Sequence, residues 1–348
     1  MQSSRFSPHA AGTLAGRSIL SALAALFVLA STAPSAVAAG HGAALRLGVY
    51  NTGLCLGNAS DWTGIRLNLR DRDLRRIDGL NLTVVTSGKA SGGRIRGAAL
   101  GVVAAGADEV DGISAAGVAV AAGRLRGLAV APVGIGLEDL TGIALGGLGV
   151  GCSRMHGIAA GILGVGGEKL TGLALGGLGA GGDTLRGIMI GGLGAGGESL
   201  HGLAIGGLGA GGEEVTGVVI AGLGAGGERM KGIAMAGLGA GGDTVRGLVL
   251  AGVGAGVSSL RGAALAVIGA RAIDARGILI GGLYSRTDRL SGVGAGAFCQ
   301  VKERLHGLTF GILNITRELH GAQVGVLNWA GNNPPARRLL PVLNWHRE

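Results

Sequence analysis

Residues 172–186 read GLALGGLGAGGDTLR, and the next fifteen residues, 187–201, read GIMIGGLGAGGESLH. The glycine that opens each stretch returns every fifteen residues from Gly97 to Gly307, without an insertion or a deletion. A fixed period of this kind indicates one short structural unit that is stacked many times. The pattern therefore predicts a repeat architecture, and it does not by itself point to a ligand or a reaction.

Apolar residues recur at fixed places when the periodic glycine is numbered position one. Positions two and four are mostly aliphatic, as at Leu173 and Leu175, position seven is leucine in many copies, as at Leu178, and position fourteen is apolar, as at Leu185. Because alternation with period two is typical of a strand, we expect positions two, four, seven and fourteen to point into a core. The Gly-Gly pair at positions five and six allows a sharp bend. The polar residues at positions ten to thirteen predict a second turn.

Two short strands and two turns per repeat predict an all-β fold, a flattened parallel β-solenoid built of fifteen-residue coils. Flanking copies that begin at Gly64, Gly79 and Gly321 bring the total to about seventeen coils. With ~4.8 Å per coil, such a stack would be on the order of 80 Å long. Helices are disfavoured because each glycine in a helix costs ~1 kcal/mol relative to alanine, and the chain has 76 glycines.

The N-terminal segment, residues 1–38, has the organisation of a secretory signal peptide. Arg5 and Arg17 supply positive charge, residues 18–33 form an apolar run, and Ala36-Val37-Ala38 provides a small-residue cleavage site. The alternative is an uncleaved membrane anchor. No later segment reaches the ~18 apolar residues of a membrane helix, so we expect no transmembrane helix after cleavage. The sequence therefore predicts an exported protein of the periplasm, the cell surface or the extracellular medium.

The rest of the chain divides into three segments. Residues 39–96 hold irregular repeats that form an N-terminal cap, residues 97–306 form the regular solenoid, and residues 307–348 hold the last repeats and a proline-containing cap. Basic residues crowd between Arg66 and Arg76 with aspartates interleaved, which favours a cap of mixed charge. Pro334, Pro335 and Pro341 are expected to stop ladder pairing and protect the terminal edge.

Charged side chains form two candidate surface columns. Position twelve is mostly acidic and position fifteen is mostly basic or histidine. Acids stacked ~5 Å apart repel one another, so we expect the neighbouring basic column to relieve that repulsion. The columns are either a solvated turn edge or a binding strip for charged polymers. Their clearest members are Asp183, Glu198, Glu213, Glu228 and Asp243 in the acidic column and Arg186, His201, Lys231 and Arg246 in the basic column.

The motifs of the chain predict no catalytic residue, no cofactor and no metal ion. The motif G-x-G-x-x-G recurs in many coils, whereas a dinucleotide fingerprint needs one copy between a strand and a helix. One acid per coil is poor for calcium, which takes six to eight oxygen ligands. Cys55, Cys152 and Cys299 lack metal or disulfide spacing, and we expect the last two to be buried. The basic N-terminal patch lacks interleaved aromatic residues, which argues against nucleic-acid binding.

The C-terminal repeats carry a family resemblance. Residues 307–320 read GLTFGILNITRELH, the next copy contains NWAGNNPP, and the chain closes with LPVLNW. These G-x-x-x-G-x-L-N copies and this cap resemble bacterial secreted glycine-rich surface-repeat proteins. The resemblance implies export to the cell envelope and a repeat architecture, and it brings no reaction and no catalytic residues.

Three functions compete on the sequence alone. The first is a non-enzymatic exported scaffold whose outward positions three, eight and ten, mostly alanine and glycine, form a flat face that packs against another copy or a cell-envelope polymer. The second is an outer-membrane β-barrel with one strand per repeat. The third is a glycan-acting solenoid enzyme, which needs convergent carboxylates, whereas the acidic column spreads them evenly.

Overall fold

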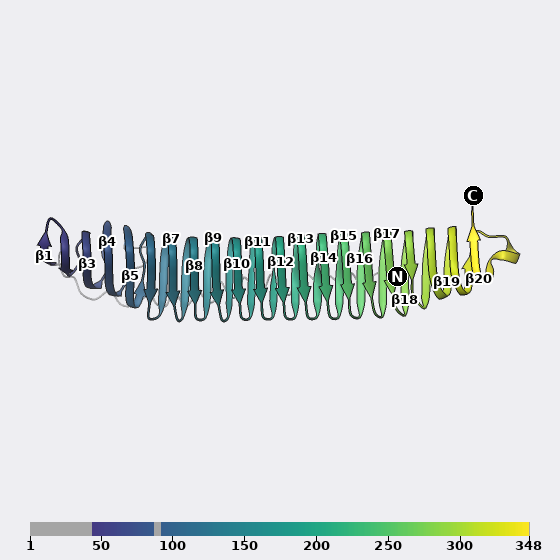
Figure 1. The fold of residues 1–348 in the computed structure, drawn as a ribbon, viewed down its shortest axis with the longest axis horizontal. Coiled ribbons are helices and arrows are strands. Elements are labelled where there is room, and N and C mark those ends of the chain that lie inside the picture. Colours follow the sequence, from purple (N-terminus) through teal and green to yellow (C-terminus); the bar gives the residue numbers. More distant parts are fainter. Residues whose placement is uncertain (1–43, 87–91, 348) are drawn as a thin grey trace, which may run out of the picture. The chain divides into compact units, whose positions relative to one another are not determined.

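The computed structural model describes residues 44–86 and 92–347, so the expected signal peptide, residues 1–38, lies outside the described residues. The described chain forms two compact units, residues 44–192 and residues 193–347. In each unit, β-strands stack one coil above the next (Figure 1). The fold is therefore a β-solenoid of coils about fifteen residues apart, which confirms the fold class that the glycine period predicts.

The first unit begins with short strands and becomes regular at β7. From β7 to β11 every strand has thirteen residues and is followed by a two-residue loop. The strands are β1 (Leu45–Val49), β2 (Thr52–Leu56), β3 (Asp61–Arg70), β4 (Arg76–Val85), β5 (Arg94–Ala105), β6 (Glu109–Ala116), β7 (Ala119–Ala131), β8 (Gly134–Gly146), β9 (Gly149–Gly161), β10 (Gly164–Gly176) and β11 (Gly179–Gly191).

The second unit continues the same pattern and ends in a hairpin. The strand β19 is uninterrupted through both corner glycines, Gly307 and Gly321, and one turn of 3-10 helix, η2 (Pro335–Arg337), precedes the last strand. The strands are β12 (Gly194–Gly206), β13 (Gly209–Ala221), β14 (Gly224–Ala236), β15 (Gly239–Ala251), β16 (Gly254–Ala266), β17 (Gly269–Gly281), β18 (Tyr284–Ala295), β19 (Phe298–Ala330) and β20 (Leu339–His346).

Neighbouring strands within each unit pair in parallel, with equivalent positions of successive coils opposite each other. In the first unit, Leu170 of β10 lies opposite Met155 of β9 and Leu185 of β11. In the second unit, the position-one glycine Gly232 lies between Gly217 and Gly247 in the same way. Each sequence position therefore becomes a column that runs along the stack.

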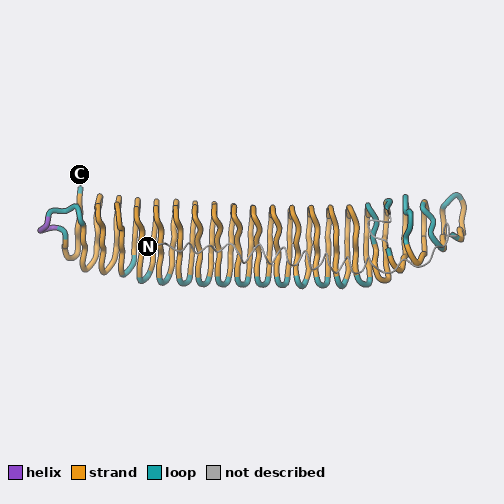
Figure 2. Tube along the Cα trace, turned by 180° about the vertical axis from the view of Figure 1, so that it is seen from behind, coloured by secondary structure: helices purple, strands orange, loops and turns teal. Residues whose placement is uncertain are grey.

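Each coil reverses direction at the position-one glycine and again at a loop formed by positions six and seven. Gly217 has a φ of 136° and Gly232 a φ of 137°, values that residues with a side chain rarely adopt. A Cβ atom at Gly232 would also run into the carbonyl oxygen of Gly217. Figure 2 shows the resulting narrow bends at one edge of the coils and the loops at the other.

The prediction of a second turn at positions ten to thirteen is therefore wrong. These residues belong to the strand in every regular coil; for example, Gly181 to Thr184 lie within β11. The polar side chains at positions twelve and thirteen face solvent from an extended strand, whereas position eleven faces the core, as at Cys152 and Val257. The corner of the coil lies at position one. Each coil has a short arm, positions two to five, and a long arm, positions eight to fifteen.

The two arms enclose a thin core that differs from the expected one. Position fourteen is buried as expected, with Leu200, Met230 and Leu260 inside, but the opposite arm contributes position three, as at Ala204 and Ala234. Positions two, four and seven face outward and are partly or largely exposed. The exposed members include Ile188, Ile190, Leu178, Leu208, Leu223, Met235 and Leu238.

The close approach of the two arms explains why the large residues at positions two and four face outward and the small residue at position three faces the core. A Cβ atom at Gly206 would collide with the carbonyl oxygen of Gly209, across the loop in the same coil. The space between the arms therefore holds mainly the large side chain of position fourteen, against a short-arm residue that is usually alanine, valine or glycine and in the regular coils is larger only at Met189 and Leu279. Large and small residues on facing layers fill such a space without voids.

Antiparallel hairpins end both stacks. β1 pairs antiparallel with β2 in the first unit, and β20 pairs antiparallel with the end of β19 in the second. Pro334 and Pro335 lie at η2, between the two strands of the last hairpin. The expectation that Pro341 stops pairing is wrong, because Pro341 lies within β20 opposite Leu327, where the register shifts.

Candidate functional site

The long arm carries both charged columns on its outer side. Asp183 and Arg186 of the first unit are exposed, and so are Glu198, Glu213, Asp243, His201, Lys231 and Arg246 of the second, whereas Glu228 is half-buried. Within β13 to β16, position fifteen is in register through Thr216, Lys231, Arg246 and Arg261. The columns are therefore continuous surface features, with evenly spaced rather than convergent groups.

Many of the ion pairs on the long arm are formed by position thirteen, a position not singled out from the sequence. Arg124 Nη1 lies 2.6 Å from Glu109 Oε1, Arg154 Nη2 lies 2.8 Å from Asp139 Oδ2, and Arg229 Nε lies 2.9 Å from Glu214 Oε1. In the described chain, Asp183, Glu198, Glu213 and Asp243 form no ion pair. Any relief of the repulsion among these four residues by the basic column therefore acts without direct ion pairs.

A signal for this ladder was present in the sequence. Position thirteen alternates in sign along the first unit, from Glu109 to Arg124, Asp139 and Arg154, at the same fifteen-residue spacing as the glycines. The hydrogen bond from Arg154 lowers the pKa of the Asp139 carboxyl below its ordinary value. Exposed pairs of this kind contribute about 0 to 1 kcal/mol each, so the ladder sets the surface pattern more than the stability.

The short arm presents an apolar outer face. In the second unit, positions two to six hold only glycine, alanine, valine, leucine, isoleucine and methionine from Leu203 to Ala297. The outward members are positions two and four, such as Leu248 and Leu250, and both are half-buried. The prediction of a flat alanine and glycine face at positions three, eight and ten is therefore wrong, because position three lies inside the coil.

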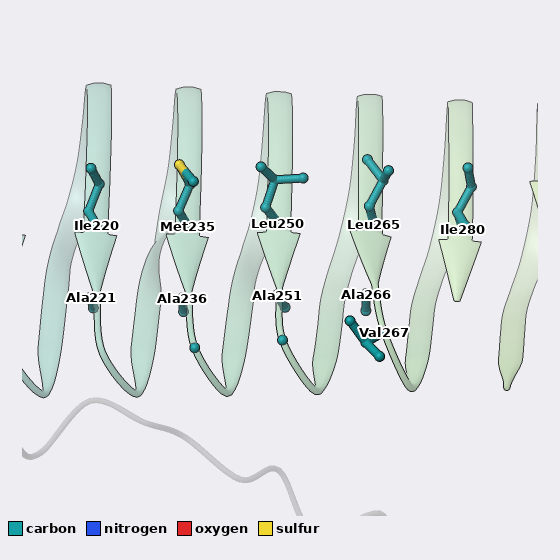
Figure 3. Close-up of a pocket in the computed structure, with 12 residues that line it drawn as sticks. Ile220, Ala221, Met235, Ala236, Leu250, Ala251, Leu265, Ala266, Val267 and Ile280 are labelled. Carbon is teal, nitrogen blue, oxygen red and sulfur yellow. The ribbon is translucent and has the colours of Figure 1, made fainter. Parts of the chain in front are cut away.

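A shallow groove of about 540 Å³ runs across the short arms of the second unit. Figure 3 shows its wall, a row of position-four side chains that stand side by side on successive strands and include Ile220, Met235 and Leu250. Its floor is made of alanine and glycine at positions five and six, such as Ala236 and Gly237, with Val267 as the exception. The groove is lined only by apolar residues and glycine, so it can hold an apolar partner.

The first unit has a groove of the same construction. Its volume is about 770 Å³, and its walls include Leu145, Leu175 and Ile190 at position four. Gly146 and Gly176 at position five form part of its floor. The groove is thus a property of the repeat rather than of one particular coil.

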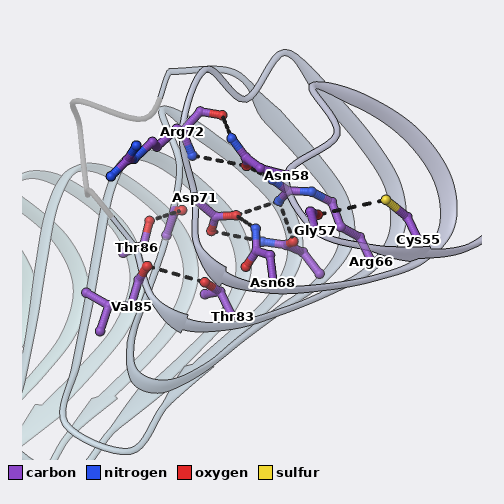
Figure 4. A network of polar contacts seen from close by, with 12 residues as sticks. Cys55, Gly57, Asn58, Arg66, Asn68, Asp71, Arg72, Thr83, Val85 and Thr86 are labelled. Carbon is purple, nitrogen blue, oxygen red and sulfur yellow. Dashed lines mark hydrogen bonds and ion pairs between the residues drawn. The ribbon is translucent and has the colours of Figure 1, made fainter. Parts of the chain in front are cut away.

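A buried polar network closes the N-terminal end of the first unit. Arg66 is fully buried, and its Nη1 donates hydrogen bonds to Asp71 Oδ1 at 2.5 Å and to Asn81 Oδ1 at 2.8 Å (Figure 4). A further hydrogen bond joins Arg66 to Asn58. The cap of mixed charge expected here therefore includes a buried ion pair, since a buried charge requires partners of this kind.

Asparagine and histidine side chains close the C-terminal end of the second unit. Asn314 Nδ2 donates to Asn328 Oδ1 at 2.7 Å, and both side chains are buried. The rings of His306 and His320 stack with centroids 4.7 Å apart, and His346 meets His320 edge-on at 6.1 Å. Among the described residues, no cluster of histidine, cysteine, aspartate and glutamate has the arrangement of a metal site.

The three cysteines are free and buried, as expected for Cys152 and Cys299. Burial raises the pKa of both of these thiols to about 12 from an ordinary value of 9.0. The thiolate is the nucleophile in cysteine chemistry. Neither residue is therefore suited to act as a nucleophile.

We expect the native protein to react with a thiol reagent at pH 8 far more slowly than the denatured protein. The raised pKa also means that the free energy of unfolding is fully retained below pH 9 and falls as the pH rises toward 12, because the unfolded thiols ionise first. The loss is about 1.4 kcal/mol per thiol per pH unit. Denaturant unfolding at several pH values, beside the double variant Cys152→Ala and Cys299→Ala, measures this slope. Rapid labelling of the native thiols, or an unchanged slope in the variant, would contradict the prediction.

No α-helix with the length and hydropathy needed to cross a bilayer occurs in the described part of the chain. Comparison of the chain with protein-family models, with curated proteins and with solved structures gives no match. The surfaces of the coil, an apolar short arm and a charged long arm, are therefore the features that point to a function.

Proposed function

We propose that this protein is an exported, non-enzymatic scaffold of the bacterial cell envelope. The observation that carries the proposal is the repetition of the outer surface: successive coils present similar apolar groups on the short arm and similar charged groups on the long arm. Catalysis requires a few groups that converge on one reacting atom, whereas extended surfaces of stacked repeats are typically used for binding. The signal-like residues 1–38 and the C-terminal resemblance to secreted surface-repeat proteins support export.

Fractionation of producing cells, with protease accessibility on intact cells, tests the location. We expect the protein in the envelope or the medium, and recovery of the full-length chain in the cytoplasm would overturn the exported part of the proposal.

Removal of whole coils tests the scaffold. Deletion of residues 217–246 joins Thr216 to Gly247 and so preserves the fifteen-residue spacing. Because stability in stacked repeats comes from nearest-neighbour contacts, we expect the shortened protein to keep its β-sheet circular dichroism and its location. If the protein were instead a glycan-acting enzyme with one catalytic site, the intact protein would cleave glycans and deletion of the coil that holds the site would abolish cleavage. Hydrolase or lyase activity on cell-wall polysaccharides would therefore contradict the proposal.

A further inference from the structure

The apolar face of the second unit comprises the outward positions two and four, and the strip at positions five and six, in the coils that begin at Gly202 to Gly292. It contains no charged side chain and no side chain able to form hydrogen bonds. A polysaccharide or a polar peptide would leave its own polar groups unpaired on such a surface, which is costly. The occupant of this face is therefore itself apolar.

The relief of the face is regular in two directions. Across the arm, the ridge of position-four side chains stands beside the strip of alanine and glycine, as Met235 stands beside Ala236 (Figure 3). Along the stack, both ridge and strip repeat at the coil spacing of ~4.8 Å. A matching surface must therefore offer ridges with the same spacing.

We propose that a second copy of this chain covers the apolar face, with the two faces related by a two-fold axis. In that arrangement the position-four ridge of each copy lies in the alanine and glycine strip of the other, and the equal spacing lets successive coils make equivalent contacts, except where Val267 stands in the strip. An isologous interface of this kind is self-complementary and closed. The inference rests on the proposed scaffold function and adds the identity of the partner surface.

The size and flatness of the face fit this partner. Seven coils at ~4.8 Å and five residues at ~3.3 Å give a flat footprint of about 550 Å² per copy, or about 1,100 Å² for the two copies together, which is above the ~1,000 Å² expected of a specific interface. Figure 1 shows β12 to β18 running side by side with little rotation from one to the next. Flat sheets of many strands are typically stabilised by stacking against another layer, and sheets pack face to face about 10 Å apart.

Sedimentation of the full-length protein across a concentration series tests the proposal. We expect a dimer in the micromolar range and at least a tenfold increase in the dissociation constant for the double variant Met235→Lys and Leu265→Lys, which places two charges on the ridge. The matched control is Thr216→Lys and Thr244→Lys, which adds the same charge to exposed sites on the long arm and should sediment like the unchanged protein. Circular dichroism checks that both variants are folded.

Each other outcome has a definite meaning. A protein that is monomeric at all concentrations, or a control variant that dissociates as fully as the ridge variant, overturns the proposed dimer. If the unchanged protein is monomeric but binds vesicles of phosphatidylethanolamine and phosphatidylglycerol, and the ridge variant does not, then the face binds lipid and the second copy is wrong. Export and tolerance of the coil deletion are measured separately, so failure of the dimer leaves the scaffold function standing.

Discussion

Replacement of Gly247 with alanine is expected to destabilise the second unit by about 3 kcal/mol or more. Gly247 has a φ of 142°, which is strained for any residue with a side chain. The added Cβ would also collide with the carbonyl oxygen of Gly232 in the preceding coil. Because this oxygen belongs to the backbone ladder, the neighbouring coil cannot move away without losing hydrogen bonds.

Gly256→Ala is the matched control for this prediction. Gly256 lies nine residues further along the chain, a Cβ there meets no atom within 4 Å, and its φ is outside the left-handed region. Alanine at such a site leaves the native state unstrained and restricts the unfolded chain, so stability should stay the same or rise by about 0.4 to 1 kcal/mol. Denaturant unfolding of the two variants measures the difference, and equal losses at both sites would show that position one is not the corner of the coil.

Replacement of Leu260 with alanine is expected to cost about 2 to 5 kcal/mol of unfolding free energy, because the side chain is 0 % exposed and its loss leaves a cavity. Leu238→Ala, at position seven, should cost far less, about 0.5 kcal/mol or less, since Leu238 is 51 % exposed. The two variants delete the same atoms from leucines at different positions of the coil. Thermal and denaturant unfolding of both therefore reports which positions form the core.

The reverse order of effects would restore the core expected from the sequence. In that arrangement position seven lies inside with position fourteen, and Leu238→Ala costs as much as Leu260→Ala. The result also bears on the proposed dimer, because a buried position seven would shift the outward face of the coil.

The fold class followed from the sequence because the period is a property of the chain alone. Glycine at position one recurs at a constant spacing of fifteen residues. Stacking identical coils in register places equivalent positions of successive repeats next to each other. The burial of Leu185 and Leu200 at position fourteen, and that of Cys152 and Cys299, could also be predicted, because these side chains are apolar and lie on the inward side of the strand.

The assignment of inner and outer faces failed on particular residues. Leu173 and Leu175 alternate with Ala174, and the usual rule places the larger residues inside. The structure buries Ala174 instead, because both faces of the short arm are apolar and period two cannot decide between them. The position-thirteen ladder of Glu109, Arg124 and Asp139 was missed for a different reason: its sign alternates between coils and is hidden when all coils are averaged.

What the sequence determined is the repeat: the length of the coil, its parallel register, the columns of like residues and the need for glycine at position one. What only the tertiary structure decided is which side of each arm faces the core. That choice depends on the distance between two arms of the same coil, which is set by backbone contacts such as the approach of Gly206 to Gly209. A spacing so small admits few large side chains per coil, mainly from position fourteen, and most of the remaining aliphatic residues are therefore on the outside, where they form the apolar face.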